Sequence, residues 1–364
     1  MRFSDKHLAF LSLIRAGVAH NVAHTLPDQI DWPAIQAIAA EHGLIGVLLD
    51  GLGFIMGVCP KQGYDKGSMQ KKLWIARVLQ QEQQYAMQQI EASKIAVIFN
   101  RHSIRTYVLK GFVVAECYPI PSHRLSSDLD CFLLPAVGEE DVWEKGNRLI
   151  EEAGYKVDRS FYKNSTFYLP GLSVENHRFM TPFRGNKNLK RLESLLQELI
   201  FKDKGDDRFE STYLCRPPVI VSALFLVEHA YSHFLHEGLI WRHILDWMMF
   251  SEKHKGEIEW TAFDAFVDNF CMRRFYDSFC NLGRYLLGEV TEEDLNARDK
   301  MMLADVWAPL DLHETLSGVK GKLALAGNTW RARWKYRYFT NISWLHALWI
   351  QVKGFIFIPH PDLK

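Results

Sequence analysis

The spacing of hydrophobic residues changes twice along this chain. In residues 5–20 and 68–102 the pattern is that of helices, with apolar positions at helical spacing and residues that favour helix. Between about residues 104 and 185, short apolar runs are separated by turn residues, which is typical of strands. From Leu189 onward the helical pattern returns. The sequence therefore predicts an α+β fold, in which a small mixed sheet is flanked by N-terminal and C-terminal helical domains.

Local signals place the helices more closely. Asp31-Trp32-Pro33 is a typical helix start, with Asp31 as the N-cap and proline in the first turn, and Gly43 ends that helix. Further helices are predicted at 44–52, 219–236 and 241–250, and the remainder is expected to be helical to about residue 356, with breaks near residues 288 and 318–321. The predicted domains are 1–103, 104–185 and 186–364.

The central segment alternates strand and helix signals. Tyr107-Val108-Leu109 combines β-branched, aromatic and apolar residues and predicts a buried strand, which Gly111 ends. Gly154 is a C-cap signal for the helix before it, and Pro170-Gly171 is a turn signal. The expected order is a strand, a helical turn at 112–117, a strand at 128–134, a helix at 139–153, and strands at 155–157, 161–169 and around Glu175.

Two aspartates in this segment are candidates for metal binding. Asp128 and Asp130 are two positions apart in a predicted strand, so both side chains point to the same face. Paired carboxylates repel each other unless a cation lies between them, and Mg²⁺ prefers oxygen ligands. Two ions held about 3.5–4 Å apart need a third acid. Glu175 is the best candidate, because its strand can lie beside that of Asp128. His177 shares the face of Glu175 and either contacts the substrate, orients Glu175 or is a structural histidine. The alternative is a strand end with exposed acids.

A lysine and a glycine precede the aspartates. Lys110 follows three apolar residues and precedes Gly111, where the end of a strand meets a turn that can hold a phosphate. Lys110 can equally be a solvated lysine. Ser126 and Ser127 either bond a phosphate or cap the entry to the next strand. Arg124 either offsets the acidic cluster or clamps a phosphate with two hydrogen bonds.

These motifs resemble the uncharacterised nucleotidyltransferase family of bacteria, a branch of the DNA polymerase beta-like nucleotidyltransferase superfamily. The resemblance rests on Leu-Lys-Gly, Tyr-Pro, Arg, Ser-Asp-Leu-Asp and an acid two residues before a histidine, and it covers about residues 100–250. It implies that Lys110 and Gly111 mark the phosphate-binding turn, that Asp128 and Asp130 are metal ligands, and that Glu175 is the third acid. The turn reads Lys-Gly-Phe, where the superfamily has Gly-Gly or Gly-Ser.

A histidine-rich helix is predicted after the sheet. His229 and His233 are four residues apart and share a face, which is a spacing that zinc can use. The segment lacks the glutamate of a His-Glu-x-x-His protease, so a zinc hydrolase is the weaker interpretation, and packing histidines are the common alternative. The region also resembles the part of the family that follows the catalytic core. This implies that His233, Arg242 or Asp246 faces the nucleotide cleft.

Composition narrows the functional classes. The 43 basic and 43 acidic residues cancel, which argues against a general polyanion-binding protein. The six cysteines include no Cys-x-x-Cys pair, so a zinc ribbon is not expected. We expect a cytoplasmic protein, because the first residues lack the pattern of a signal peptide and no uncharged apolar run has the length of a transmembrane helix.

Near the C-terminus, residues 330–339 interleave basic and aromatic side chains. This mixture suits stacking on single-stranded nucleic acid or contact with an anionic membrane. An amphipathic helix whose aromatic side chains reach the core is the favoured interpretation. The apolar tail at 342–359 is predicted to be the last packed helix.

Together these features predict a metal-dependent nucleotidyltransferase. Asp128, Asp130 and Glu175 would hold two Mg²⁺ or Mn²⁺ ions and a nucleoside triphosphate donor. The enzyme would move a nucleoside monophosphate to a hydroxyl of an unknown acceptor, which is a small molecule, a protein or an RNA end, and release pyrophosphate. The alternative is a non-catalytic nucleotide-binding or antitoxin-like module with the same fold, which Phe112 in the turn and the long spacer before Asp128 favour.

Overall fold

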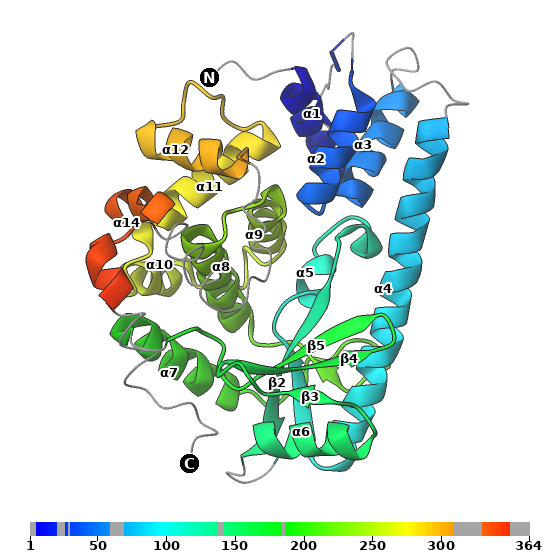
Figure 1. Ribbon diagram of the computed structural model, residues 1–364, viewed down its shortest axis with the longest axis vertical. Helices are drawn as coiled ribbons and strands as arrows, with labels where there is room; N and C mark the ends of the chain where they lie inside the picture. The colour runs from blue at the N-terminus through cyan, green and yellow to red at the C-terminus, as the bar shows by residue number, and fades with distance from the viewer. Residues whose placement is uncertain are drawn as a thin grey trace.

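The computed structural model describes residues 5–19, 26–27, 30–58, 69–136, 141–183, 186–308 and 330–349. Helices α1 (Asp5–Ala19), α2 (Trp32–Glu41) and α3 (Ile45–Val58) gather at one end of the molecule, and the sheet lies at the other (Figure 1). The long helix α4 (Met69–Arg101) runs alongside, from the first helices to the sheet. The helices from residue 187 onward form a third group. The predicted α+β fold is therefore confirmed.

The sheet is mixed and has six strands in the described part of the chain, in the order β3-β4-β5-β2-β1-β6. Strand β2 lies near its centre, antiparallel to β1 and parallel to β5. The parallel register sets Asp130 opposite Glu175. The strands are β1 (Ile104–Val108), β2 (Asp128–Pro135), β3 (Val157–Asp158), β4 (Asn164–Leu169), β5 (Leu172–His177) and β6 (Leu214–Cys215).

Helix α6 (Val142–Glu152) packs on one face of the sheet through a buried polar network. Asn147 accepts hydrogen bonds from Ser165 at 2.6 Å and from Asn176 at 2.9 Å, and the Trp143 indole donates to the Asn176 carbonyl at 2.9 Å. Side chains alternate along a strand, so this arrangement directs the neighbours of Asn176 to the opposite face. Residues 137–140, which include the start of the predicted helix at 139–153, lie outside the described residues.

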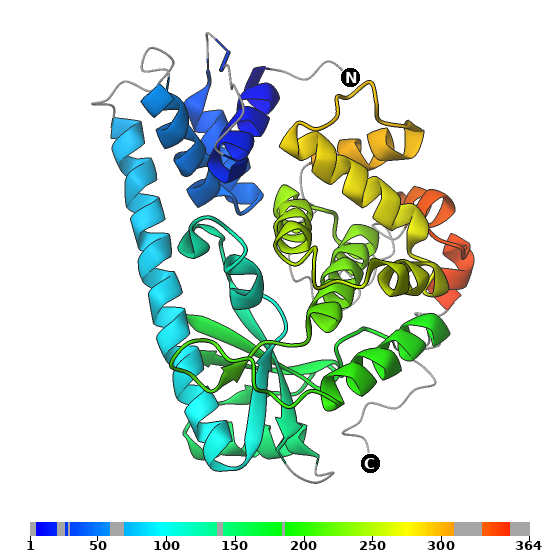
Figure 2. The same ribbon diagram turned by 180° about the vertical axis from the view of Figure 1, so that it is seen from behind.

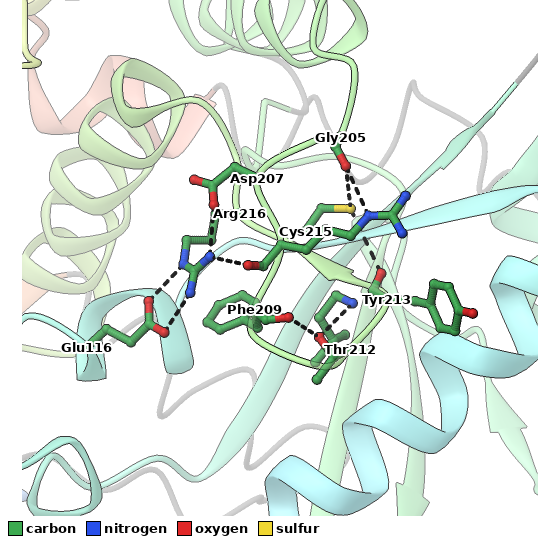
Figure 3. Close-up of polar contacts among 10 residues, drawn as sticks. Glu116, Gly205, Asp207, Phe209, Thr212, Tyr213, Cys215 and Arg216 are labelled. Carbon is green, nitrogen blue, oxygen red and sulfur yellow. Dashed lines mark hydrogen bonds and ion pairs between the residues drawn. The ribbon is translucent and has the colours of Figure 1, made fainter.

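The sequence pattern does not predict β6, because two residues carry no periodicity. The residue after β6 nevertheless ties two parts of the fold together. Arg216 donates to both oxygens of Glu116, at 2.8 and 2.7 Å, and to Asp207 at 2.8 Å (Figure 3). Glu116 follows α5 (Phe112–Ala115), and Arg216 stands just before α8 (Val219–His236). The pair therefore fixes the start of α8 against the end of α5.

The C-terminal group consists of helices stacked beside the sheet, in agreement with the predicted helical pattern. Helix α11 ends at Gly288, whose φ of 81° is left-handed, so the break predicted there is confirmed. The break predicted at 318–321 and the part of the last helix beyond residue 349 lie outside the described residues. The helices, besides α8, are α7 (Lys187–Phe201), α9 (Trp241–Lys253), α10 (Trp260–Asn269), α11 (Arg273–Leu287), α12 (Ala297–Val306) and α14 (Arg333–Phe339).

Part of the basic and aromatic segment at 330–339 packs inward. Tyr336 and Phe339 are buried, and the Lys335 ammonium donates to the Phe234 carbonyl at 2.7 Å and to Asp305 at 2.8 Å. The core-helix interpretation is therefore confirmed for these side chains. Trp330 is 54 % exposed and does not join them.

The three predicted domains share one continuous hydrophobic core, which contains buried side chains from each of them. The boundaries at 103 and 185 stay a prediction. Among the described helices, α8 is the one whose length and hydropathy match a membrane span, and 56 % of that segment is buried inside the protein. Burial of this kind is what a core helix shows.

A histidine joins the N-terminal helices to the sheet loop. His123 is buried, and its ring contacts Asp50 of α3 at 2.7 Å and Glu82 of α4 at 2.8 Å. Burial by itself lowers the pKa of His123, but the two carboxylates outweigh it and raise the pKa above its usual value. The protonated ring donates to both acids, so the link is strongest when His123 is charged.

We expect replacement of His123 by Gln to destabilise the protein in a pH-dependent way. The folded-state pKa is raised, so the stabilisation is present below the unfolded pKa near 6.5 and is lost as the pH rises through the folded value. The loss in free energy of unfolding should be about 1–2 kcal/mol at pH 6, because Glu82 is partly exposed, and smaller at pH 8.5. Urea unfolding at both pH values measures it. An equal loss at both would contradict the charged link.

Candidate active site

The two aspartates and Glu175 lie side by side in the sheet. In the parallel ladder of β2 and β5, Asp130 pairs with Glu175, and Asp128 is one strand repeat before Asp130. His177 lies between the acids, with its Nε2 2.9 Å from Asp130 Oδ1 and 3.4 Å from Glu175 Oε2. One ligand atom each from Asp130, Glu175 and His177 falls within 4.8 Å of the others. The strand pairing thus brings together Asp130 and Glu175, two of the three acids that the sequence predicts as neighbours.

The two aspartates have opposite electrostatic surroundings. Burial by itself raises the pKa of Asp130, but the hydrogen bond and charge of His177, with Lys110 beyond, hold the pKa well below its usual value. Burial, followed by the charge of Asp130, raises the pKa of Asp128. These surroundings favour the ionised form of Asp130, whereas Asp128 takes up a proton more readily.

The turn before the aspartates requires glycine. Gly111 has φ 63° and ψ −100°, a left-handed conformation that favours glycine, and a β-carbon there would lie 3.2 Å from the Ser126 hydroxyl. Ser126 donates to the Asp128 carbonyl at 3.2 Å, and its own carbonyl accepts from Gln88 of α4 at 3.2 Å. These two hydrogen bonds of Ser126 therefore stabilise the turn and the start of β2.

Lys110 is buried at the start of this turn. Its ammonium lies 2.6 Å from Nε2 of His229 on α8. Burial lowers the pKa of Lys110 to about 8, and the charge of Asp130 opposes the shift. A solvated lysine is thus excluded. This cation is held inside the protein by an imidazole that accepts its hydrogen bond.

A cavity of about 130 Å³ lies against this turn. Helix α5 and the loop after it stand between α4 and the α8–α9 pair, as Figure 2 shows from behind. Ser127, which is exposed, bonds Asp128 Oδ1 at 3.2 Å at the edge of the cavity. Asp130, Glu175, His177, Ser126 and Asp246 are not among the lining residues. Those that line it are Lys110, Gly111, Arg124, Leu125, Ser127, Asp128, His229, His233, Arg242 and His243.

Arg124 and Asp246 form a buried ion pair behind this cavity. The Arg124 guanidinium donates to Asp246 at 3.1 Å through Nε and at 2.7 Å through Nη2, and Tyr118 donates to the same carboxylate at 2.8 Å. Arg242 donates to the Leu125 carbonyl at 2.7 Å. The predicted phosphate role of Arg124 and the predicted cleft role of Asp246 stay predictions. Arg124 and Asp246 are bonded to each other, and Tyr118 is bonded to Asp246, so these contacts hold the loop in place.

Sequence reasoning left two histidines of this cavity without a place in the nucleotide site. His229 is more than a hundred positions from Lys110, and no motif joins them. His243 comes from α9 and has no spacing relation to the α8 histidines. Nothing in the sequence signals these contacts, because they depend on how α8 and α9 pack against the sheet.

The mixed sheet thus carries two aspartates on one strand and a glutamate on the next, with a glycine turn beside them, as the sequence resemblance implies. The family model of the uncharacterised nucleotidyltransferases matches residues 28–288. The chain therefore belongs to this family and is a nucleotidyltransferase enzyme. The match extends beyond the 100–250 region of the sequence resemblance, into the N-terminal helices and to α11. No curated protein and no solved structure matches the chain.

Proposed function

We propose that the protein moves a nucleoside monophosphate from a nucleoside triphosphate to a hydroxyl group, in a reaction that depends on divalent metal ions. The observation that carries this proposal is the strand register, which sets the carboxylates of Asp130 and Glu175 side by side and aligns Asp128 on the same face. Asp130 and Glu175 offer ligand oxygens within 4.8 Å of each other, in a group that includes His177. Carboxylate oxygens are ligands that Mg²⁺ and Mn²⁺ prefer. The donor set therefore fits such ions.

In this proposal Asp128, Asp130 and Glu175 hold two Mg²⁺ or Mn²⁺ ions. When bound, the ions lower the pKa of the acceptor hydroxyl and neutralise charge on the pyrophosphate that leaves. His177 keeps Asp130 ionised and holds it beside Glu175, through contacts of 2.9 and 3.4 Å. The role of His177 is thus to position the acids, and not to contact the donor.

In this proposal, residues beside the cavity accept the proton of the acceptor hydroxyl and stabilise the charge of the phosphates. The acceptor oxygen forms a bond to the α-phosphorus, the bond to the pyrophosphate oxygen breaks, and Asp128 accepts the hydroxyl proton. Asp128 suits this step because it is the one acid among the residues that line the cavity. Lys110 and the backbone at Gly111 stabilise phosphate charge, and Ser127 and Arg242 border the same space.

The test is transfer of label from an α-³²P-labelled nucleoside triphosphate, in the presence of Mg²⁺ or Mn²⁺, to acceptors in fractionated small-molecule, protein and RNA pools. We expect label in one pool and release of pyrophosphate, both abolished by EDTA. Binding of Mn²⁺ followed by electron paramagnetic resonance should approach two ions per chain with triphosphate present. If neither transfer nor Mn²⁺-dependent triphosphate binding is found, the proposal is wrong.

The family assignment favours this function over the alternatives. It supports an enzyme, which the non-catalytic module would not be, and it supports nucleotidyl transfer over a zinc hydrolase built on His229 and His233. A cytoplasmic location is part of the same proposal. The acceptor is left to the labelling experiment.

A further inference from the structure

Three histidines form one wall of the cavity beside Asp128. His229 and His233 come from α8, and His243 comes from α9. Their ring centroids are 4.5 Å apart for His229 and His233, 4.7 Å for His233 and His243, and 6.0 Å for His229 and His243. One nitrogen from each lies within 4.8 Å of the others. Such a cluster can receive either a metal ion or an anion.

The hydrogen bonding of the three rings is incomplete. His229 Nε2 accepts from Lys110 at 2.6 Å, and His233 Nδ1 contacts Glu237 at 2.8 Å. His243 is more than nine-tenths buried, and its Nδ1 has no hydrogen-bond partner. A buried polar atom without a hydrogen-bond partner costs free energy. Nδ1 of His243 is therefore available to bind a ligand or a solvent molecule in the cavity.

The charges around the wall decide which kind of ligand fits. Lys110, Arg124 and Arg242 all border the cavity, and the Arg242 Nε also has no hydrogen-bond partner. Asp246 is already bonded to Arg124 and Tyr118. Asp128 remains as the single acid among the lining residues. A metal ion on the histidines would have to sit beside these cations, whereas an anion gains from all of them.

We propose that His229, His233 and His243 form the inner wall of a polyphosphate pocket, which holds the pyrophosphate end of the donor and takes up protons as it fills. This inference rests on the proposed function for the identity of the donor. The chemistry that the pocket recognises is more general, since imidazolium, ammonium and guanidinium groups all donate charge-assisted hydrogen bonds to phosphate oxygens.

Proton uptake follows from the surroundings of the wall. Burial lowers the pKa of His229 and His243 well below the usual value, and neighbouring charges of Lys110 and of the other histidines add to it. The charged groups that face them are Lys163 for His229, Arg124 and Arg242 for His243, and Glu237 for His233. A bound polyanion opposes this lowering of the pKa, because its negative charge stabilises the protonated histidine rings.

The experiment uses the full chain, inorganic pyrophosphate and inorganic tripolyphosphate, with EDTA present. Titration calorimetry at pH 7 in two buffers of different ionisation enthalpy gives the affinity and the number of protons taken up. We expect binding with net proton uptake in the wild type. His229→Gln and His243→Gln should each bind roughly tenfold more weakly and take up fewer protons, since each loses a hydrogen bond to a charged ligand.

His254→Gln is the matched control, because this histidine lies just after α9, bonds Glu257 and is not among the residues that line the cavity. It should bind as the wild type does. Far-ultraviolet circular dichroism and melting curves establish that each variant is folded. Unchanged affinity and unchanged proton uptake in folded His229→Gln and His243→Gln would overturn the proposal. So would stoichiometric Zn²⁺ binding that these variants abolish, with no binding of either phosphate compound.

This experiment tests the polyphosphate pocket independently of the nucleotidyl-transfer reaction. Phosphate binding is measured without nucleotide or divalent ions, so its result does not depend on the metal ions that the transfer reaction needs. If nucleotidyl transfer is never found but the histidine variants bind pyrophosphate more weakly than the wild type, the proposed pocket is supported and the proposed function is wrong. If nucleotidyl transfer is found and the histidine variants bind pyrophosphate as the wild type does, the proposed function is supported and the proposed pocket is wrong.

Discussion

Replacement of Asp130 by Asn should reduce nucleotidyl transfer roughly 10³-fold or more, because loss of one metal-binding carboxylate removes several kcal/mol of transition-state stabilisation. Asn keeps the shape of the side chain and can still accept the hydrogen bond that His177 now donates to Asp130 at 2.9 Å. The fold should therefore survive. The measurement is transfer from α-labelled triphosphate, together with Mn²⁺ binding by electron paramagnetic resonance, where affinity should fall in parallel.

Asp158→Asn is the matched control for this variant. Asp158 belongs to the same sheet, in β3 at its far edge, and it is exposed. The same loss of one negative charge there should leave transfer and Mn²⁺ binding unchanged. Full transfer activity in Asp130→Asn, with normal Mn²⁺ affinity, would show that β2 does not carry the reaction.

The second large effect concerns stability. Asp246→Asn should lower the free energy of unfolding by about 3–5 kcal/mol, since it leaves the buried guanidinium of Arg124 without its counter-charge. The side chains of Arg124 and Asp246 are 2 % and 3 % exposed. Urea unfolding followed by tryptophan fluorescence measures the change. Asp207→Asn, which removes a 69 % exposed partner of Arg216, should cost less than about 1 kcal/mol.

A double replacement tests the cause of this loss. Arg124→Met combined with Asp246→Leu removes both charges and fills the space with apolar atoms, so it should recover much of the stability lost in Asp246→Asn. Recovery identifies an unpaired buried charge as the cost. A double variant as unstable as the single one would instead assign the loss to packing around Tyr118.

The arrangement of the three carboxylates can be predicted only in part from the sequence. Asp128 and Asp130 share a face because side chains alternate along any strand, and this follows from two positions alone. Glu175 is different. Its strand signal is local, but its position beside Asp130 depends on β5 pairing parallel to β2, with this register and no other. The sequence could nominate Glu175 as the third acid, and the pairing decided its distance.

The cavity was beyond what local patterns can predict. The contact between Lys110 and His229, and the ion pair between Arg124 and Asp246, each join residues more than a hundred positions apart. No periodicity relates such pairs, because their contact depends on where α8 and α9 settle on the sheet. His243 could not be assigned to the site for the same reason, and the short strand β6 carried too few residues for a pattern.

The sequence by itself determined the mixed architecture, the glycine turn after β1 and the paired aspartates, since all of these arise from interactions between residues close along the chain. Only the tertiary structure decided that a histidine wall faces that turn, that Arg124 is bonded to Asp246, and that Lys110 is buried. The physical reason is that long-range packing brings charges into a low-dielectric interior. There, the partners that surround a side chain determine what it can do.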